Sequence, residues 1–162
     1  MSFPSKYIAA IALGSNLDSE FGDRAANLRT GIERVGALGR VVAVSDFYDT
    51  APVGYLDQPR FLNAALLLET EQQPLQLLEG LLGIERAMGR DRSATVAKGP
   101  RVIDLDLLLF GDEVMETPSL TLPHPAMRER QFVLEPLAEI AGDIIDPVTR
   151  QSIKQLLTAL KD

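Results

Sequence analysis

The 162-residue chain contains no cysteine, no tryptophan and a single histidine. The absence of cysteine excludes a disulfide framework, a thiolate metal site and a cysteine nucleophile. No run of about 18 apolar residues is present, so no segment is expected to cross a membrane. The first residues lack the charged and then apolar layout of a signal peptide, and we therefore expect a cytoplasmic protein.

Positive charge is scarce outside one segment. The net charge of −7 argues against a general nucleic-acid binder, which needs a basic face. Between residues 86 and 101, however, Asp91 is the single acidic residue among five cations: Arg86, Arg90, Arg92, Lys98 and Arg101. A basic segment in an acidic chain indicates one local anion rather than a long polyanion.

The spacing of apolar residues predicts the order β-α-β-β-α-β. Strands are expected over residues 6–13, 40–50, 61–69 and 99–110, and helices over 23–35 and 74–89. This order is typical of an α+β, ferredoxin-like fold, in which an antiparallel sheet carries both helices on one face. The first and fourth strands are strongly apolar, so we expect them to be central and adjacent.

Residues beyond 110 are expected to add to this core. The sequence predicts a short strand over 113–116, a proline-rich segment over 118–125, helical structure within 126–140 and a helix over 152–160. We expect the added helices to cover the second face of the sheet. Nothing in the sequence divides the chain or demands a partner chain, so a single domain over residues 1–162 and a monomer are expected.

The strand predicted over 99–110 carries two carboxylates in an apolar run. Alternation places Ile103, Leu105 and Leu107 on one face, and Asp104, Asp106, Leu108 and Phe110 on the other. The two carboxylates then lie roughly 6 to 7 Å apart, where their repulsion and desolvation favour a bound cation. Oxygen ligands without histidine or cysteine suit Mg²⁺. The alternative is a wet strand end where both aspartates are simply solvated.

The basic segment has two interpretations. It is either a solvated surface loop or a mobile lid whose guanidinium groups bind phosphate oxygens. Because Arg101 begins the strand that carries Asp104 and Asp106, placement favours the lid. Metal carboxylates with arginines are the parts that phosphoryl transfer needs. Neither a Walker A sequence nor Gly-x-Gly-x-x-Gly occurs, so a nucleotide site here must be built differently.

Four other residues are candidates for ligand contacts. His124 lies in the rigid segment Thr121-Leu-Pro-His-Pro125, although a lone histidine is more often structural. Asn63 offers a donor and an acceptor that suit a heterocyclic amide edge, and Phe61 and Phe132 could stack on a ring. Composition alone favours the alternative, in which Phe61 and Phe132 are core residues and Asn63 is a polar group whose hydrogen bonds are satisfied within the protein.

Taken in order, the motifs resemble those of the 6-hydroxymethyl-7,8-dihydropterin pyrophosphokinase family. The resemblance runs from about Tyr7 to Ile140. The most specific motif is Gly99-Pro-Arg-x-x-Asp-Leu-Asp106, followed by Leu122-Pro-His124. The others are Ala12-Leu-Gly-Ser-Asn16, Gly89-Arg-Asp-Arg92, and Thr50-Ala-Pro-Val-Gly54 with Asp57-Gln-Pro-Arg-Phe-Leu-Asn-Ala-Ala65.

The resemblance implies transfer of a pyrophosphoryl group from ATP to the pterin hydroxymethyl oxygen, which gives AMP in a step of tetrahydrofolate synthesis. It implies that Asp104 and Asp106 bind two Mg²⁺ ions and that Arg90, Arg92 and Arg101 act on the phosphates. The implied pterin contacts are Thr50, Val53, Phe61, Asn63 and Phe132. The implied nucleotide contacts are Glu85, Arg92, Lys98, Ile103, Thr121, His124 and Arg130.

Three positions depart from the family pattern. Ala97 and Lys98 stand where the family often has a basic residue and then an aromatic, so a residue that could seal the pterin pocket is missing. Leu82 replaces a polar residue that some members turn toward the nucleotide. These departures concern the lid and substrate affinity rather than the reaction.

Two rival functions fit the same scaffold. A metal-dependent phosphohydrolase would use the same aspartates without a pterin pocket. An RNA-binding module would need exposed aromatic residues on a basic central face, whereas this central strand carries aspartates in an acidic chain.

Overall fold

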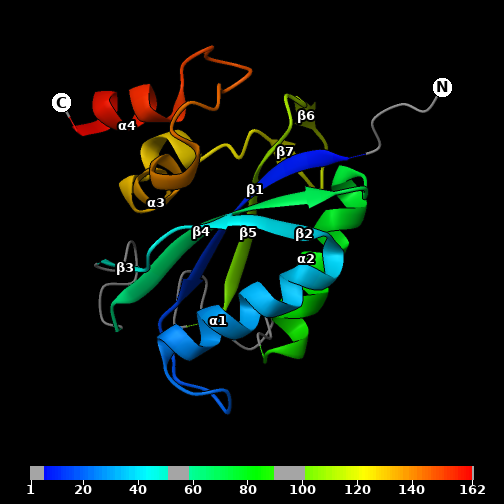
Figure 1. Cartoon of the computed structure of the whole chain (residues 1–162), viewed down its shortest axis with the longest axis vertical. Coiled ribbons are helices and arrows are strands. Elements are labelled where there is room, and N and C mark those ends of the chain that lie inside the picture. Colours follow the sequence, from blue (N-terminus) through cyan, green and yellow to red (C-terminus); the bar gives the residue numbers. More distant parts are fainter. Residues whose placement is uncertain (1–5, 51–58, 90–100, 162) are drawn as a thin grey trace.

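An antiparallel sheet of five strands forms the middle layer of the molecule (Figure 1). The computed structural model describes residues 6–50, 59–89 and 101–161. The main strand order is β2-β4-β1-β5, and β3 pairs with β4 beyond the end of β2. The strands are β1 (Tyr7–Ser15), β2 (Arg40–Val44), β3 (Tyr48–Thr50), β4 (Phe61–Thr70) and β5 (Asp104–Phe110).

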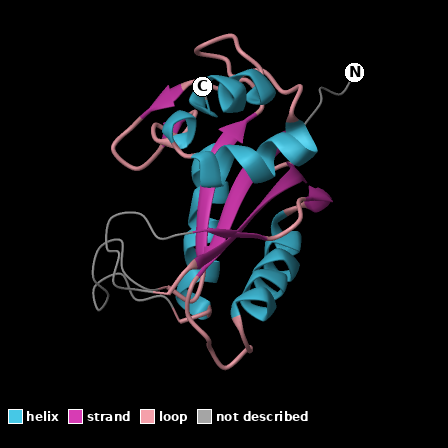
Figure 2. Ribbon diagram, turned by 90° about the vertical axis from the view of Figure 1, so that its left-hand side faces the viewer, coloured by secondary structure: helices cyan, strands magenta, loops and turns pink. Residues whose placement is uncertain are grey.

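Helices cover both faces of this sheet, as Figure 2 shows from the side. One face packs against the first two helices and the other against the last two, giving two separate apolar cores. The first pair is α1 (Arg24–Val35), extended by η1 (Gly36–Leu38), and α2 (Pro74–Ala87). The second pair is α3 (Gln131–Ala141), preceded by η2 (Met127–Glu129), and α4 (Ile153–Lys161).

Local sequence signals fix the helix ends on the first face. Asp23 caps α1, because its Oδ1 accepts a hydrogen bond of 2.9 Å from the Ala26 amide. Pro74 begins α2, where its missing N–H costs nothing. Gly89 follows α2 with a φ of 101°, a conformation that favours glycine.

The ferredoxin-like order and the adjacency of the first and fourth strands are confirmed, with one correction of position. β1 is central, but β5 is the last strand in the order that the described residues form. The Leu108 carbonyl on β5 accepts a hydrogen bond of 2.9 Å from the His124 amide, and helices cover both of its faces. Such cover explains why an edge strand reads as an apolar run.

The predicted side of Phe110 is wrong, because β5 contains a bulge. Ile11 pairs with Leu107 and Ala10 pairs with Leu109, which leaves Leu108 as an extra residue. The extra residue reverses the alternation, so Phe110 packs on the α1/α2 side, 5.0 Å from the Tyr7 ring centroid.

Other strand predictions need new bounds, and the strand expected over 99–110 begins at Asp104. The strand expected over 40–50 is divided into β2 and β3, and Ser45 between them binds the Ala65 backbone through its amide and its hydroxyl. The strand expected over 113–116 is shorter, β6 (Met115–Glu116), and it pairs with β7 (Thr121–Leu122) inside the proline-rich segment.

No helix in the described part of the chain is both long enough and apolar enough to span a membrane.

Candidate active site

The two strands that flank β1, β4 and β5, place polar side chains on the sheet face that α3 covers. Asn63 on β4 pairs with Gly14 on β1, and Gly14 pairs with Asp104 on β5. One step along the same face, Ala12 pairs with Asp106. The two carboxylates therefore share a face, as the alternation predicts, and the amide lies across the central strand from them.

The central strand makes room for a cavity of about 90 Å³ above this row. Of the three β1 residues that line it, the two on the same face as the aspartates, Ala12 and Gly14, are small. A Cβ atom at position 14 would lie 3.1 Å from Asn63 Oδ1 and 3.6 Å from Phe61 Cδ1. Glycine at position 14 thus keeps the floor of the cavity open.

The same cavity has aromatic walls and an amide edge. Phe61 lies on one side of it and Phe132, from the first turn of α3, on another. Asn63, which is 6% exposed, donates a hydrogen bond from Nδ2 to Thr50 Oγ1. The Arg130 guanidinium carbon lies 5.7 Å from the Phe132 ring centroid, within cation–π range. A flat ring with polar edges fits such a lining.

Arg101 brings a cation to the carboxylate pair. Its Nη1 donates to Asp104 Oδ2 at 3.0 Å, and both side chains are largely buried, 16% and 20% exposed. Its Nε is buried and has no hydrogen-bond partner among the described residues. An Arg–carboxylate pair at the rim of a cavity can bind an anion through the remaining donors of the guanidinium.

Asn16 links the segments that lead into β4 and β5. Its Oδ1 accepts a hydrogen bond from the Arg101 backbone amide at 2.6 Å, and its backbone amide donates to the Arg101 carbonyl at 3.0 Å. Its Nδ2 donates to the Pro59 carbonyl at 3.1 Å, just before β4. The side chain is 1% exposed, so these bonds hold the rim of the cavity from beneath.

A second cavity, of about 230 Å³, lies on the other side of Asp106. Asp106 lines both cavities. The second cavity is formed by α2, β5 and the segment that includes β7, and its lining includes Leu78, Leu82, Leu107, Thr121 and His124. Asp106 therefore lies at the junction of two cavities with different chemistry.

His124 is held in the second cavity as a neutral imidazole. Burial lowers its pKa most, the charge of Arg130 lowers the pKa further, and Asp104 opposes them. Its Nδ1 accepts a hydrogen bond of 3.1 Å from the Ala126 amide. The neutral ring therefore carries its proton on Nε2, which can donate to a ligand.

Most of the residues predicted from the sequence are brought together. Thr50, Phe61, Asn63, Arg101, Asp104, Asp106, Arg130 and Phe132 line the first cavity, and Thr121 and His124 line the second. Val53, Arg90, Arg92 and Lys98 lie outside the described residues.

Glu85 and Ile103, predicted as nucleotide contacts, line neither cavity. Glu85 is 1% exposed on α2, and its Oε2 accepts a hydrogen bond of 2.7 Å from the Leu105 amide. Ile103 is fully buried in the core between α1 and the sheet, close to Gly31. Both contacts hold β5 in place beneath the carboxylates.

The carboxylate pair fits Mg²⁺ in its donor chemistry. No group of three or more His, Asp or Glu that could hold a metal lies within residues 6–50, 59–89 and 101–161. Magnesium is commonly bound by one or two carboxylates together with substrate phosphates and water. Asp104 and Asp106, on one strand face beside Arg101, have the oxygen ligands for that arrangement.

Ala12, Gly14 and Asn16 contribute to the site individually in ways that were not predicted from the sequence. Small residues at alternate positions of an apolar strand were the available signal for an open floor. Asn16 ends the family motif that begins at Ala12, but its contacts could not be predicted from it, because its partners at positions 59 and 101 are distant in the chain.

Comparison with known proteins agrees with this geometry. A family model described as 7,8-dihydro-6-hydroxymethylpterin-pyrophosphokinase (HPPK) matches residues 10–142. The chain is 46% identical over 150 residues to 2-amino-4-hydroxy-6-hydroxymethyldihydropteridine pyrophosphokinase of Bacillus subtilis, covering 91% of this chain and 86% of the relative. The protein of the same name from Methylorubrum extorquens is 44% identical over 154 residues, which cover 94% of this chain and 92% of the relative.

Longer proteins match as well. Folic acid synthesis protein fol1 of Schizosaccharomyces pombe is 40% identical over 155 residues, which cover 94% of this chain but 20% of that protein. The chain thus spans about a fifth of the length of this fungal relative. The crystal structure of Plasmodium falciparum HPPK-DHPS wild type with pteroate shares the fold, with a TM-score of 0.74 at 16% identity, covering 95% of this chain and 42% of that one. On the family match and the bacterial relatives, the chain belongs to the 7,8-dihydro-6-hydroxymethylpterin-pyrophosphokinase family.

Proposed function

We propose that this chain transfers a pyrophosphoryl group from ATP to the hydroxymethyl oxygen of 6-hydroxymethyl-7,8-dihydropterin and releases AMP. Family membership supports the enzyme class, a pyrophosphokinase of folate synthesis, and ATP as its co-substrate. The observation that carries the proposal is the position of Asp106, which lines both cavities. A reaction between two substrates needs such a junction, because their reacting atoms must meet in line.

The first cavity is assigned to the pterin. The Asn63 amide, fixed by its bond to Thr50, faces the heterocycle's edge with a donor and an acceptor. Phe61 and Phe132 contact the ring faces. The open floor at Gly14 leaves room for a flat ring, and the pterin hydroxymethyl group extends toward Asp104 and Asp106.

The second cavity is assigned to the nucleotide. Leu78, Leu82 and Leu107 provide apolar surface for the base, and Thr121 and His124 provide hydrogen bonds. Arg101 and Arg130 lie on the side of the first cavity, where the phosphates of a nucleotide would reach. Their charges offset the negative charge that builds up during transfer.

Asp104 and Asp106 would hold two Mg²⁺ ions. Bound Mg²⁺ supplies charge neutralisation on the phosphate oxygens and a template for in-line attack. The protein contributes the fixed carboxylates, the Arg101 cation and the exclusion of water by α3. Several expectations stay predictions from the sequence. They are the phosphate contacts by Arg90, Arg92 and Lys98 and the pterin contact at Val53. They also include a monomeric state, a cytoplasmic location and a single domain over residues 1–162.

The test is the identity of the nucleotide product. The protein is mixed with ATP, Mg²⁺ and the hydroxymethyl dihydropterin, and the products are separated by chromatography. AMP with the pterin pyrophosphate is the expected result. ADP or free phosphate as the product would contradict pyrophosphoryl transfer, and phosphate release without pterin would favour the phosphohydrolase. A matched control omits the pterin, because AMP should then not accumulate.

A further inference from the structure

Three charged residues, from α1, from β3 and from the residue before β4, meet beside the first cavity. Asp49 on β3 accepts from Arg24 Nη2 at 3.0 Å and from Arg60 Nε at 2.8 Å. Arg24, the first residue of α1, also donates from Nη1 to the Arg60 carbonyl at 2.8 Å, and Arg60 Nη2 donates to the Asp49 carbonyl at 3.2 Å. We call Arg24, Asp49 and Arg60 the ionic clamp.

The ionic clamp lies next to two proposed pterin contacts in the chain. Thr50 follows Asp49 on β3, and Phe61 follows Arg60 at the start of β4. Thr50 and Phe61 are also direct partners across the two strands. None of the three clamp residues lines the cavity itself. A change in the ionic clamp would therefore reach the pterin through Thr50 and Phe61.

β3 needs such an anchor, because it has only three residues and pairs with β4 alone in the described sheet. The first residue of β3 is bound to α3, since Tyr48 Oη donates a hydrogen bond to Glu139 Oε1 on that helix at 2.6 Å. The side chain of Asp49 is the contact that joins β3 to both α1 and the start of β4.

We infer that Asp49, held by Arg24 and Arg60, is a positioning residue that sets affinity for the pterin by fixing Thr50 and Phe61. The inference rests on the proposed pterin site. The hydrogen bonds from Arg24 and then Arg60 hold the pKa of Asp49 below its usual value, so the clamp stays charged at neutral pH.

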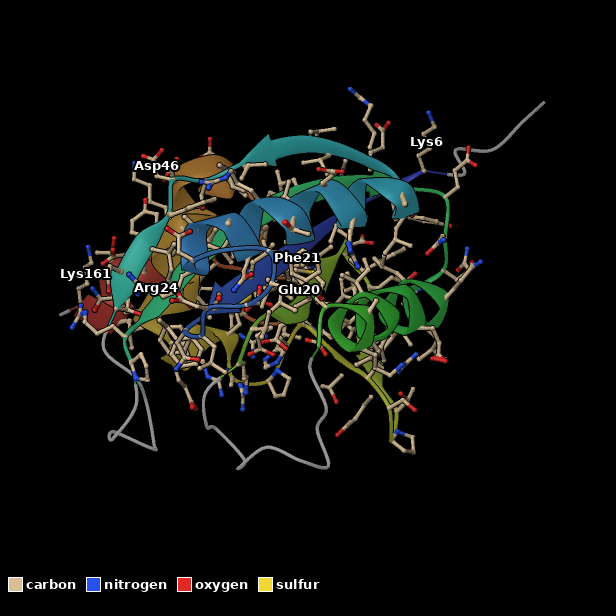
Figure 3. All side chains as sticks on the ribbon, turned by 90° about the horizontal axis from the view of Figure 1, so that it is seen from below. Lys6, Glu20, Phe21, Arg24, Asp46 and Lys161 are labelled. Carbon is tan, nitrogen blue, oxygen red and sulfur yellow. The ribbon has the colours of Figure 1, made fainter. Side chains whose placement is uncertain are left out.

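The other end of β4 offers a matched control. Glu69 accepts from Arg40 Nε at 3.4 Å and lies 3.7 Å from Lys6 Nζ, so it is another acidic residue between two cations. In Figure 3, Lys6 lies at one end of the molecule and Arg24 near the other. Loss of either acidic residue removes two exposed ion pairs, which are shorter at Asp49 than at Glu69, but only Asp49 adjoins the cavity.

The experiment compares wild type, Asp49→Asn, Asp49→Glu and Glu69→Gln in the AMP assay, at saturating MgATP and varied pterin. For Asp49→Asn we expect the pterin KM to rise about threefold to tenfold, because exposed ion pairs in a small network contribute modestly. The KM for ATP should stay unchanged, and Asp49→Glu should recover part of the loss. Glu69→Gln should leave both KM values at the wild-type level.

Salt gives a second readout. In wild type the pterin KM should rise with ionic strength, because salt weakens the clamp, and in Asp49→Asn this dependence should be smaller. An unchanged pterin KM in Asp49→Asn, or an equal rise in Glu69→Gln, would overturn the inference. Wild-type protein that forms no AMP would instead reject the proposed function, so the two failures are distinct.

Discussion

The two faces of the central strands differ in what fills them. On the α1/α2 face, Leu13, Leu66 and Leu105 are at most 2% exposed and join one apolar core. On the other face, the same strands carry Gly14, Asn63 and two aspartates around a cavity. Strand alternation thus puts the stabilising core and the chemistry on neighbouring residues.

The difference arises from where the covering helices lie. α1 and α2 pack against β1 and β5 on one face, whereas α3 packs over Ala10, Ala65 and Leu67 on the other. The cavity begins beyond Ala10, at Ala12 and at the pair Gly14 and Asn63, where Phe132 and Val133 at the start of α3 form its wall. One face of the sheet stabilises the fold while the other holds the site. Substitutions on the first face should therefore lower stability, and substitutions on the second should lower activity.

The largest effect is expected for Asp106→Ala. Loss of the carboxylate shared by both cavities should lower kcat by at least about 10³-fold, since fixed charge stabilisation of this kind is worth that much or more. The melting temperature should change little, because removing one of two neighbouring like charges relieves repulsion. Asp104→Ala should behave similarly in steady-state kinetics. Activity near wild type in either variant would remove the metal assignment.

A leucine in the core of the opposite face should behave in the reverse way. Leu66→Ala opens a cavity in the α1/α2 core and should cost about 2 to 5 kcal/mol of unfolding free energy, and Leu66 lines neither site cavity. In the folded fraction, KM for both substrates should stay near wild type. Urea unfolding and steady-state kinetics at low temperature measure the two effects. A large change in KM with unchanged stability would break the distinction between the faces.

A substitution on the floor of the first cavity should affect one substrate and not the other. In Gly14→Val the added side chain would meet Asn63 Oδ1 and Phe61 Cδ1, so the pterin KM should rise roughly tenfold or more. The ATP KM should not follow, because the second cavity is not lined by Gly14. Gly36→Ala is the control, since a Cβ there has no atom within 4 Å. Equal effects of the two variants on pterin KM would contradict the assignment.

Much of this arrangement could be predicted from the sequence, because it depends on periodicity. Alternation placed Asp104 and Asp106 on one face, and the element order predicted the ferredoxin-like sheet. The side of Phe110 could not be predicted, since a bulge at Leu108 follows from pairing with β1 rather than from local pattern.

The site was predicted less completely than the fold. The resemblance indicated Asn63 and Phe132, but Asn16 acts through backbone partners far along the chain, which no local pattern reveals. The resemblance also implied a nucleotide contact for Glu85, which stays a prediction, and the structure adds that its side chain accepts a hydrogen bond from the buried Leu105 amide. Charge type alone does not distinguish a ligand contact from a buried hydrogen bond.

The smallest expected effect is a pH dependence of stability that comes from His124, on the side of the molecule that holds the site. Because burial and Arg130 lower the pKa of His124, its NMR titration should have a midpoint below the ordinary value of about 6.5. Below that ordinary value the unfolded chain binds a proton that the folded chain resists, so stability falls as pH drops. His124→Gln should therefore lose less unfolding free energy than wild type between about pH 7.5 and 5.5. A midpoint above the ordinary value would mean that Asp104 outweighs burial, and the second cavity would then present a cation rather than a neutral donor.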